Sequence, residues 1–123
     1  MDWSRSHMAK FLKILRIELE DLEQHIEALV ADTLERQKNR EVSENVCLEN
    51  VAVLKNEEYG IDHFIRVIDA MAPKDYEDLA AIVEDIRRQF REELKRAALA
   101  NAAYAFADLR IARVDAYIRD SMC

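Results

Sequence analysis

A single glycine and a single proline in 123 residues restrict more than any other feature what this chain can fold into. Turn-rich β-sandwiches and barrels need many residues that tolerate a positive φ angle or end a strand, and this chain has almost none. Half of the residues are hydrophobic and 35% are charged, which is typical of a folded protein rather than a disordered one. The sequence therefore predicts an all-α protein, and its length fits one domain.

The first predicted helix covers about residues 8–36. Its apolar residues are spaced by threes and fours, as in the seam of a coiled coil. They are Phe11, Leu15, Leu19, Leu22, Ile26 and Leu29. Further apolar side chains widen this stripe, which favours a bundle in which the helix has more than one neighbour.

A polar segment follows, in which Val42 is the one apolar residue between Arg36 and Asn45. Asn39, Ser43 and Asn45 can each cap a helix, because a short side-chain oxygen can accept a hydrogen bond from a free N–H group of the first turn. We expect a hairpin turn near residues 37–44. The alternative is one continuous helix from residue 8 to residue 70, which at 1.5 Å per residue would be about 90 Å long.

A second helix is predicted over about residues 45–71. Its apolar rhythm continues on both sides of Gly60, so we expect Gly60 to lie inside the helix, at a cost of about 1 kcal/mol relative to alanine. Such a glycine often marks a bend or a close crossing of helices, and the alternative is that the helix breaks there. Pro73 ends this helix, because its ring disfavours a helical conformation at Ala72, and Asp75 can cap the next one.

The third predicted helix covers about residues 75–120. Neither glycine nor proline interrupts it. A mostly apolar series in steps of three and four, with Asn101, Asp108 and Asp115 among its members, continues from Leu79 to Ile118, so we expect one helix about 68 Å long. The predicted fold is an antiparallel helical hairpin plus one long C-terminal helix, in an elongated bundle like a coiled coil. Because this helix is longer than either other segment, part of it must overhang, bend back or pack on another chain.

The last part of that helix is the candidate functional surface. Its middle is rich in alanine, which lets another helix approach closely, and after Leu99 its apolar residues are not confined to one stripe. We predict that this surface binds a protein partner or a second copy of the chain. Its residues are Leu99, Asn101, Tyr104, Phe106, Leu109, Ile111 and Tyr117. The alternative is that the two preceding helices cover this face.

Asn101 falls on the predicted seam of the last helix. A polar side chain at such a position commonly fixes the register and the oligomeric state, at some cost in stability. The alternative is that Asn101 is turned toward solvent at one end of the bundle.

Charge and residue types argue against several activities. The net charge of −7 repels the phosphates of nucleic acid, so no nucleic-acid partner is expected. A chain with one glycine cannot build a glycine-rich phosphate loop, and no nucleophile has a base that the sequence makes evident. No apolar run is long enough to span a membrane, and the first residues lack the apolar stretch of a secretory signal. We expect a cytoplasmic protein without a cofactor.

The alternative class is a small helical-bundle enzyme or a metal-binding protein that uses His25 or His63 with nearby carboxylates. Glu18, Asp21 and His25 share one face of the first predicted helix. Di-iron sites in helical bundles, however, use Glu-x-x-His pairs, and neither histidine has a glutamate three residues before it. We therefore expect a non-enzymatic protein.

The two ends and the cysteines complete the domain prediction. Ser6-His7-Met8 resembles the junction that an expression vector leaves, so we expect residues 1–7 to be vector-derived or disordered. Residues 8–123 would then form a single all-α domain. Cys47 and Cys123 make neither a disulfide framework nor a zinc pattern, and we expect Cys47 to pack as a small hydrophobic residue.

The order of the predicted elements resembles a known family. The residues that carry this likeness are Phe11-Leu12-Lys13-Ile14-Leu15, Glu18-Leu19-Glu20-Asp21-Leu22 and Ala28-Leu29 in the first helix, and Glu93-Leu94-Lys95 and Leu99-Ala100-Asn101-Ala102-Ala103 in the last. With a polar turn and a second helix between them, they are similar to the flagellar (type III) export chaperones that escort hook-associated proteins. The resemblance implies a cytoplasmic, non-enzymatic chaperone whose last helix captures a helical segment of its client.

Overall fold

The computed structural model describes residues 3–121, which form four α-helices and one short 3-10 helix. These are α1 (Trp3–Lys38), α2 (Glu44–Asp69), η1 (Pro73–Asp75), α3 (Leu79–Arg96) and α4 (Asn101–Ser121). The described residues contain no strand, so the predicted all-α class is confirmed. Between residues 3 and 121, no helix is both long and apolar enough to cross a membrane.

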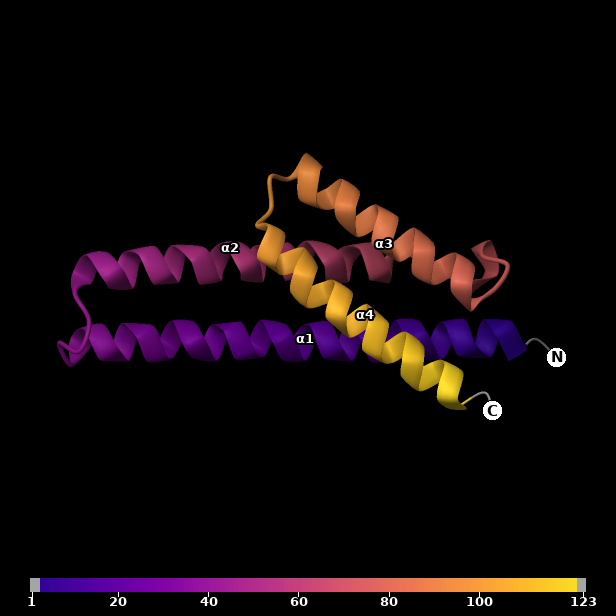
Figure 1. Ribbon diagram of the computed structural model, residues 1–123, viewed down its shortest axis with the longest axis horizontal. Coiled ribbons are helices and arrows are strands. Elements are labelled where there is room, and N and C mark those ends of the chain that lie inside the picture. The colour runs from indigo at the N-terminus through magenta and orange to yellow at the C-terminus, as the bar shows by residue number, and fades with distance from the viewer. Residues whose placement is uncertain (1–2, 122–123) are drawn as a thin grey trace.

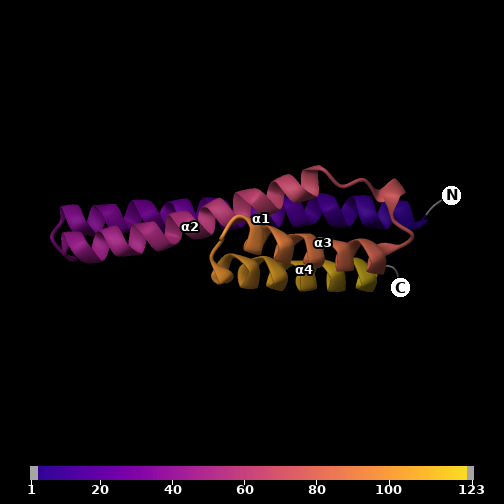
Figure 2. The same ribbon diagram turned by 90° about the horizontal axis from the view of Figure 1, so that it is seen from above.

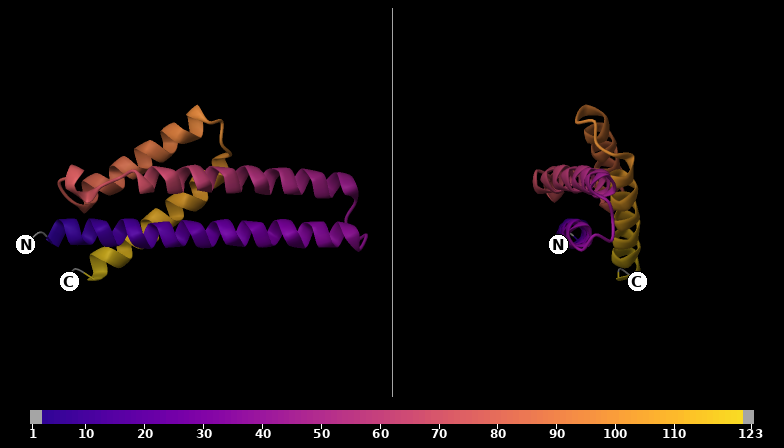
Figure 3. Two further views of the ribbon diagram at one scale, coloured as in Figure 1. Left: turned by 180° about the vertical axis from the view of Figure 1, so that it is seen from behind. Right: turned by 90° about the vertical axis from the view of Figure 1, so that its left-hand side faces the viewer.

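The helices form two layers. α1 and α2 make an antiparallel hairpin, and α3 and α4 cross one face of it (Figure 1 and Figure 2). The view from the end shows α4 running across both hairpin helices (Figure 3), and α4 contacts α1 as well as α2. The hairpin extends beyond the second layer at its closed end (Figure 1). The molecule is thus a compact four-helix arrangement, and the prediction of a hairpin plus one long helix is wrong in its second part.

The predicted turn between the first two helices is confirmed. α1 ends at Lys38, and Arg40 adopts a positive φ of 62° while the amide of Glu41 donates to the carbonyl of Arg36 at 2.8 Å. This bond reaches back five residues and closes a Schellman motif, which ends a helix although no glycine is present. Of the three capping candidates, Ser43 begins α2, because its Oγ accepts a hydrogen bond from the amide of Val46 at 3.2 Å.

The inner faces of α1 and α2 form most of the core of the hairpin. Five of the six predicted seam residues of α1 are buried, but Leu29 is 41% exposed and Val30 is buried in its place. The step from Ile26 to the next seam residue is therefore four residues, to Val30, and not the predicted three, to Leu29. Cys47 is buried, as expected, and its Sγ lies 3.8 Å from the carbonyl oxygen of Thr33.

Gly60 lies inside α2 and is buried, so the predicted uninterrupted helix is confirmed. A Cβ atom at this position would lie 2.7 Å from the Cβ of Ala103 in α4, which is closer than real Cβ atoms approach. The glycine therefore permits the close crossing of α2 and α4 that its place in the helix indicated. The cost of a helical glycine is offset by the packing of α4 against the hairpin.

The third helix begins later than predicted. Residues Pro73–Asp75 form the 3-10 helix η1, and Asp78 rather than Asp75 caps α3, its Oδ1 accepting from the amide of Ala81 at 2.9 Å. Both aspartates fit the sequence rule for a cap, but the fixed φ of Pro73 favours a short tight turn directly after α2. The connection to α3 is correspondingly longer.

The predicted helix over residues 75–120 is broken between α3 and α4. Ala98 has a positive φ of 52°, and the amide of Leu99 donates to the carbonyl of Leu94 at 3.0 Å. This is a second Schellman motif, with alanine where glycine is usual, at a cost of about 1–2 kcal/mol. The turn folds α4 back so that Leu99 and the inner face of α4 are buried. Burial of a helix face outweighs local helix propensity, because each large apolar side chain contributes about 1.5–3 kcal/mol.

The N-terminal part of α1 belongs to the folded molecule. α1 begins at Trp3, five residues before the predicted start, and Met8 is fully buried. Whether residues 1–7 are vector-derived stays a prediction, and Met1, Asp2 and Cys123 lie outside the described residues. The two layers also meet at stacked aromatic rings: the ring centroids of Phe64 in α2 and Phe90 in α3 are 4.2 Å apart.

Candidate protein-interaction surface

The two sides of α4 differ in what they contact. One side is buried against the hairpin, and its residues recur in steps of four and three, as one face of a helix requires. They are Ala103, Ala107, Ile111, Val114 and Ile118. Four residues on the opposite side, Ala105, Leu109, Ala112 and Ala116, are all exposed and share the same spacing.

We define the α4 outer face as these four exposed residues together with Phe106. Leu109 is 53% exposed and Phe106 is 38% exposed, while the alanines around them are too small to stand between an approaching helix and the backbone. The α4 outer face therefore exposes apolar groups on a helix whose other face is already buried. It can form a non-polar contact with another helix.

The predicted surface residues separate into two groups. Leu99 and Ile111 are buried in the molecule's own core, and Tyr104 is half-buried. Phe106, Leu109 and Tyr117 are exposed, and so is Asn101. The structure thus brings only part of the predicted set to the surface, because sequence spacing does not say which side of α4 the hairpin covers.

Asn101 is the first residue of α4 and is turned toward solvent. It does not occupy a buried seam position, because the helix that would have carried that seam through it ends at Arg96. Within this chain Asn101 is therefore turned toward solvent, as the alternative interpretation stated, and is not a buried residue that fixes the register.

Polar contacts fix both tyrosines of α4. The hydroxyl of Tyr104 accepts a hydrogen bond from Arg91 of α3 at 3.2 Å. The ring of Tyr117 lies 5.8 Å from the ammonium group of Lys10 in α1, a cation–π geometry, and borders a shallow pocket with Ile14 and Arg113. Tyr104 thus contacts α3, and Tyr117 contacts α1.

The two histidines of the alternative prediction lie apart. His25 borders a shallow pocket with Glu18 and Asp21, so the predicted row on one helix face is real. His63 of α2 is within 2.9 Å of Glu93 in α3, measured from Nδ1 to Oε2. No group of three potential metal ligands occurs among residues 3–121. His63 thus joins α2 to α3, while His25 lies on the face of α1 with Glu18 and Asp21, and the two histidines share no common centre among the described residues.

Glu93 is held in its ionised form. Arg96, one turn later on α3, donates to its carboxylate and is the largest cause of the lowered pKa of Glu93. The hydrogen bond with His63 lowers that pKa further, against the opposing effect of burial. The contact of His63 with Glu93 therefore joins α2 to α3. With its lowered pKa, Glu93 is suited to a structural ion pair and not to donating a proton.

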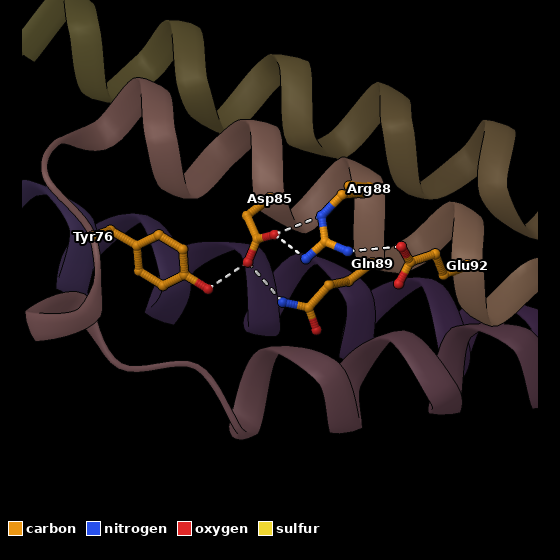
Figure 4. A network of polar contacts seen from close by, with 5 residues as sticks. All are labelled: Tyr76, Asp85, Arg88, Gln89 and Glu92. Carbon is orange, nitrogen blue, oxygen red and sulfur yellow. Dashed lines mark hydrogen bonds and ion pairs between the residues drawn. The ribbon is translucent and has the colours of Figure 1, made fainter.

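A second polar network fastens the start of α3 to the connection before it. Asp85 accepts hydrogen bonds from the hydroxyl of Tyr76 at 2.5 Å and from Gln89 at 2.8 Å, and it also pairs with Arg88 (Figure 4). Burial would raise the pKa of Asp85, but these three hydrogen bonds together lower it. Desolvation, followed by the bond to Asp85, raises the pKa of Tyr76 to about 12. Arg88 also pairs with Glu92, one turn later on α3, at 2.7 Å.

The end of the hairpin carries exposed apolar residues that sequence reasoning missed. Val46 and Val53 precede Gly60 by multiples of seven residues and so lie on the side of α2 that faces α4 at Gly60, and both are exposed. On α1, Leu29 lies two turns beyond Leu22, which borders a pocket with Arg110 of α4. The seven-residue spacing of Val46, Val53 and Gly60 is the signal that could have found this face.

Comparison with family models, with curated proteins and with solved structures gave no match. The resemblance to flagellar export chaperones stays a prediction from the residue pattern.

Proposed function

We propose that this chain is a non-enzymatic protein-interaction module, of the chaperone or adaptor kind, that binds helices and associates with itself through the α4 outer face. The observation that carries the proposal is the exposure of Leu109 and Phe106 on a helix whose opposite face is already used. Burying both side chains against a second helix removes their remaining apolar surface from water, at a gain of about 1 kcal/mol for each, because each is already about half buried.

The shape and charge of the face support a helical partner. Ala105, Ala112 and Ala116 have small side chains on either side of Leu109, which would let a second helix approach closely. Arg110 and Arg113 lie beside the α4 outer face, so acidic residues that flank the apolar stripe of a partner helix would be favoured over basic ones. Glu and Asp are abundant in this chain itself, which is consistent with self-association.

The test is the mass in solution of a variant with Phe106→Arg and Leu109→Arg, measured by light scattering from dilute to concentrated protein. The matched control is Leu48→Arg, since Leu48 is 61% exposed near the far end of the hairpin. We expect the wild type and the control to rise above the monomer mass of 14.4 kDa with concentration, and the double variant to have a lower mean mass. Equal mean masses for all three proteins, with their helix content unchanged, would contradict the proposal.

A further inference from the structure

The connection between α3 and α4 adopts a backbone conformation that its own residues do not favour. Ala98 has a φ of 52°, in the left-handed region that a Cβ atom makes unfavourable. Its neighbours Ala97, Leu99 and Ala100 are among the strongest helix formers, and none of them is glycine or proline. The local sequence therefore favours a continuous helix at the point where the chain turns back.

Contacts with other elements keep this connection bent. The side-chain Oδ1 of Asn56 in α2 accepts a hydrogen bond from the amide of Ala100 at 3.0 Å, and Leu99 is buried. In a continuous helix the amide of Ala100 would instead donate to the carbonyl of Arg96, so the bond to Asn56 exists only in the bent form. The balance between the bent and the straight forms thus depends on a few identifiable groups.

The pairing of α3 with α4 has an internal symmetry. Arg87 donates to Asp108 at 2.9 Å, and Arg91 donates to the hydroxyl of Tyr104 at 3.2 Å. In both pairs the midpoint along the sequence falls between residues 97 and 98. Two chains with straight connections, related by a two-fold axis through that midpoint, can therefore form each of these contacts between chains in place of within one.

We propose that a second copy of this chain is a partner by exchange of α4. In this dimer the segments of α3 and α4 form one continuous helix in each chain, and the α4 segment of each copy occupies the site that α4 of the other has left. The buried row from Ala103 to Ile118 then meets the same hairpin surface, including the contact of Ala103 with Gly60. Exchange of this kind is a low-cost way to form a dimer, because it reuses an existing interface.

The energetics of the exchange depend on the connection alone. Each chain loses the bond between Asn56 and Ala100 and the packing of Leu99 in the bent connection, and gains a relaxed backbone at Ala98. Residues 94–101 of the two copies face one another across the two-fold axis, and their alanines allow the helices to approach closely. The α4 outer face stays exposed in both forms, so this inference does not rest on the proposed function.

Ala98→Gly tests the connection directly. Glycine favours the left-handed conformation of the bent form and disfavours the straight helix, so both effects act against exchange. We expect the dissociation constant of the exchanged dimer to rise at least tenfold for each connection, and about 100-fold for the two. Ala105→Gly is the matched control, since it weakens α4 equally in both forms and leaves the constant unchanged within about threefold.

Asn56→Ala tests the same balance in the opposite direction. It removes a hydrogen bond that only the bent form makes, so we expect the dissociation constant to fall by about tenfold. Light scattering at several concentrations measures all four proteins. A wild type and an Asn56→Ala variant that both stay monomeric at the highest concentration would overturn the proposal.

Cross-linking shows whether a dimer has exchanged α4. In a background of Cys47→Ala and Cys123→Ser, the substitutions Arg87→Cys and Asp108→Cys are introduced, and the two new thiols are joined by a short bismaleimide. The purified dimer is expected to run as a covalent dimer on a denaturing gel, and the purified monomer as a single linked chain. If every cross-link in the dimer joins two residues of the same chain, α4 has not been exchanged and the inference is overturned. If the variant with Phe106→Arg and Leu109→Arg then no longer forms that dimer, the proposed function is still supported. If this variant still forms a dimer with cross-links between chains, exchange of α4 is supported and self-association through the α4 outer face is not.

Discussion

Gly60 and Ala103 face one another where α2 crosses α4, and a side chain at residue 60 would meet the buried Ala103. The distance of 2.7 Å that a Cβ at residue 60 would have to Ala103 shows that the crossing depends on the hydrogen atom of glycine. Leu99 is the next neighbour, at 3.8 Å from that point, which is an ordinary contact. The strain of a substitution would therefore fall on a single pair of atoms.

Gly60→Ala is expected to destabilise the protein by about 1–2 kcal/mol, because the clash exceeds the gain of about 1 kcal/mol in helix propensity. Denaturant unfolding of the two single variants and of Gly60→Ala with Ala103→Gly gives the coupling between the sites. We expect Ala103→Gly to be less harmful in the Gly60→Ala background than in the wild type. Strict additivity would contradict a direct clash.

Arg40 and Ala98 end α1 and α3 in the left-handed conformation without the help of glycine. Arg40 lies at the tip of the hairpin, and its side chain is exposed. Arg40→Gly is expected to raise the free energy of unfolding by about 1 kcal/mol, because glycine relieves the backbone strain. Arg40→Ala keeps the Cβ atom and is expected to give no such gain in the same unfolding experiment. Equal stabilities of these two variants would contradict the strain at this position.

At the scale of the elements, α1 and α2 pack through an apolar seam, and acidic side chains also meet between them. Burial is the largest cause of the raised pKa of Glu23, and Asp62, Glu58 and Glu27 add like-charge repulsion. The folded protein thus binds a proton at Glu23 more tightly than the unfolded chain does. Stability is lost as the pH rises through the ordinary value of 4.5 toward the raised pKa in the folded state, and the cost remains at neutral pH.

Glu23→Gln is expected to stabilise the hairpin at neutral pH by about 0.5 kcal/mol, a value kept small because solvent screens a partly exposed group. The gain should vanish below the ordinary pKa of 4.5, where Glu23 is protonated in both states. Glu49→Gln removes the same charge from an exposed position of α2 and serves as the control. Thermal unfolding at several pH values checks this, and a gain that does not depend on pH would count against the assigned cause.

The elements also show what the sequence could and could not predict. The α1–α2 hairpin and the place of Gly60 followed from apolar spacing and a capping serine, because these signals are local. The break at Ala98 did not, since its neighbours all favour a helix and only the burial of α4 on a distant surface explains the turn. The candidate surface could be predicted only in part, because it also depends on how α4 packs against residues distant in the sequence. Phe106 and Leu109 could be named as surplus apolar residues, but the burial of Ile111 depends on which side of α4 meets the hairpin.

At the scale of the whole molecule, the two layers differ in length, and this difference leaves apolar groups exposed. The second layer covers one half of the hairpin, while Leu29, Val46 and Val53 remain exposed on the other half. The outer face of α4 adds Phe106 and Leu109 on the far side of the same layer. A small protein with two such surfaces is expected to associate, because a monomer leaves both in contact with water.

The mass of the unmodified protein in solution, followed from dilute to concentrated samples, tests this account most directly. Association through helix faces predicts that the mean mass rises above 14.4 kDa as the concentration increases. A mass that stays at the monomer value throughout would contradict both the proposed self-association through α4 and the exchange of α4 between copies.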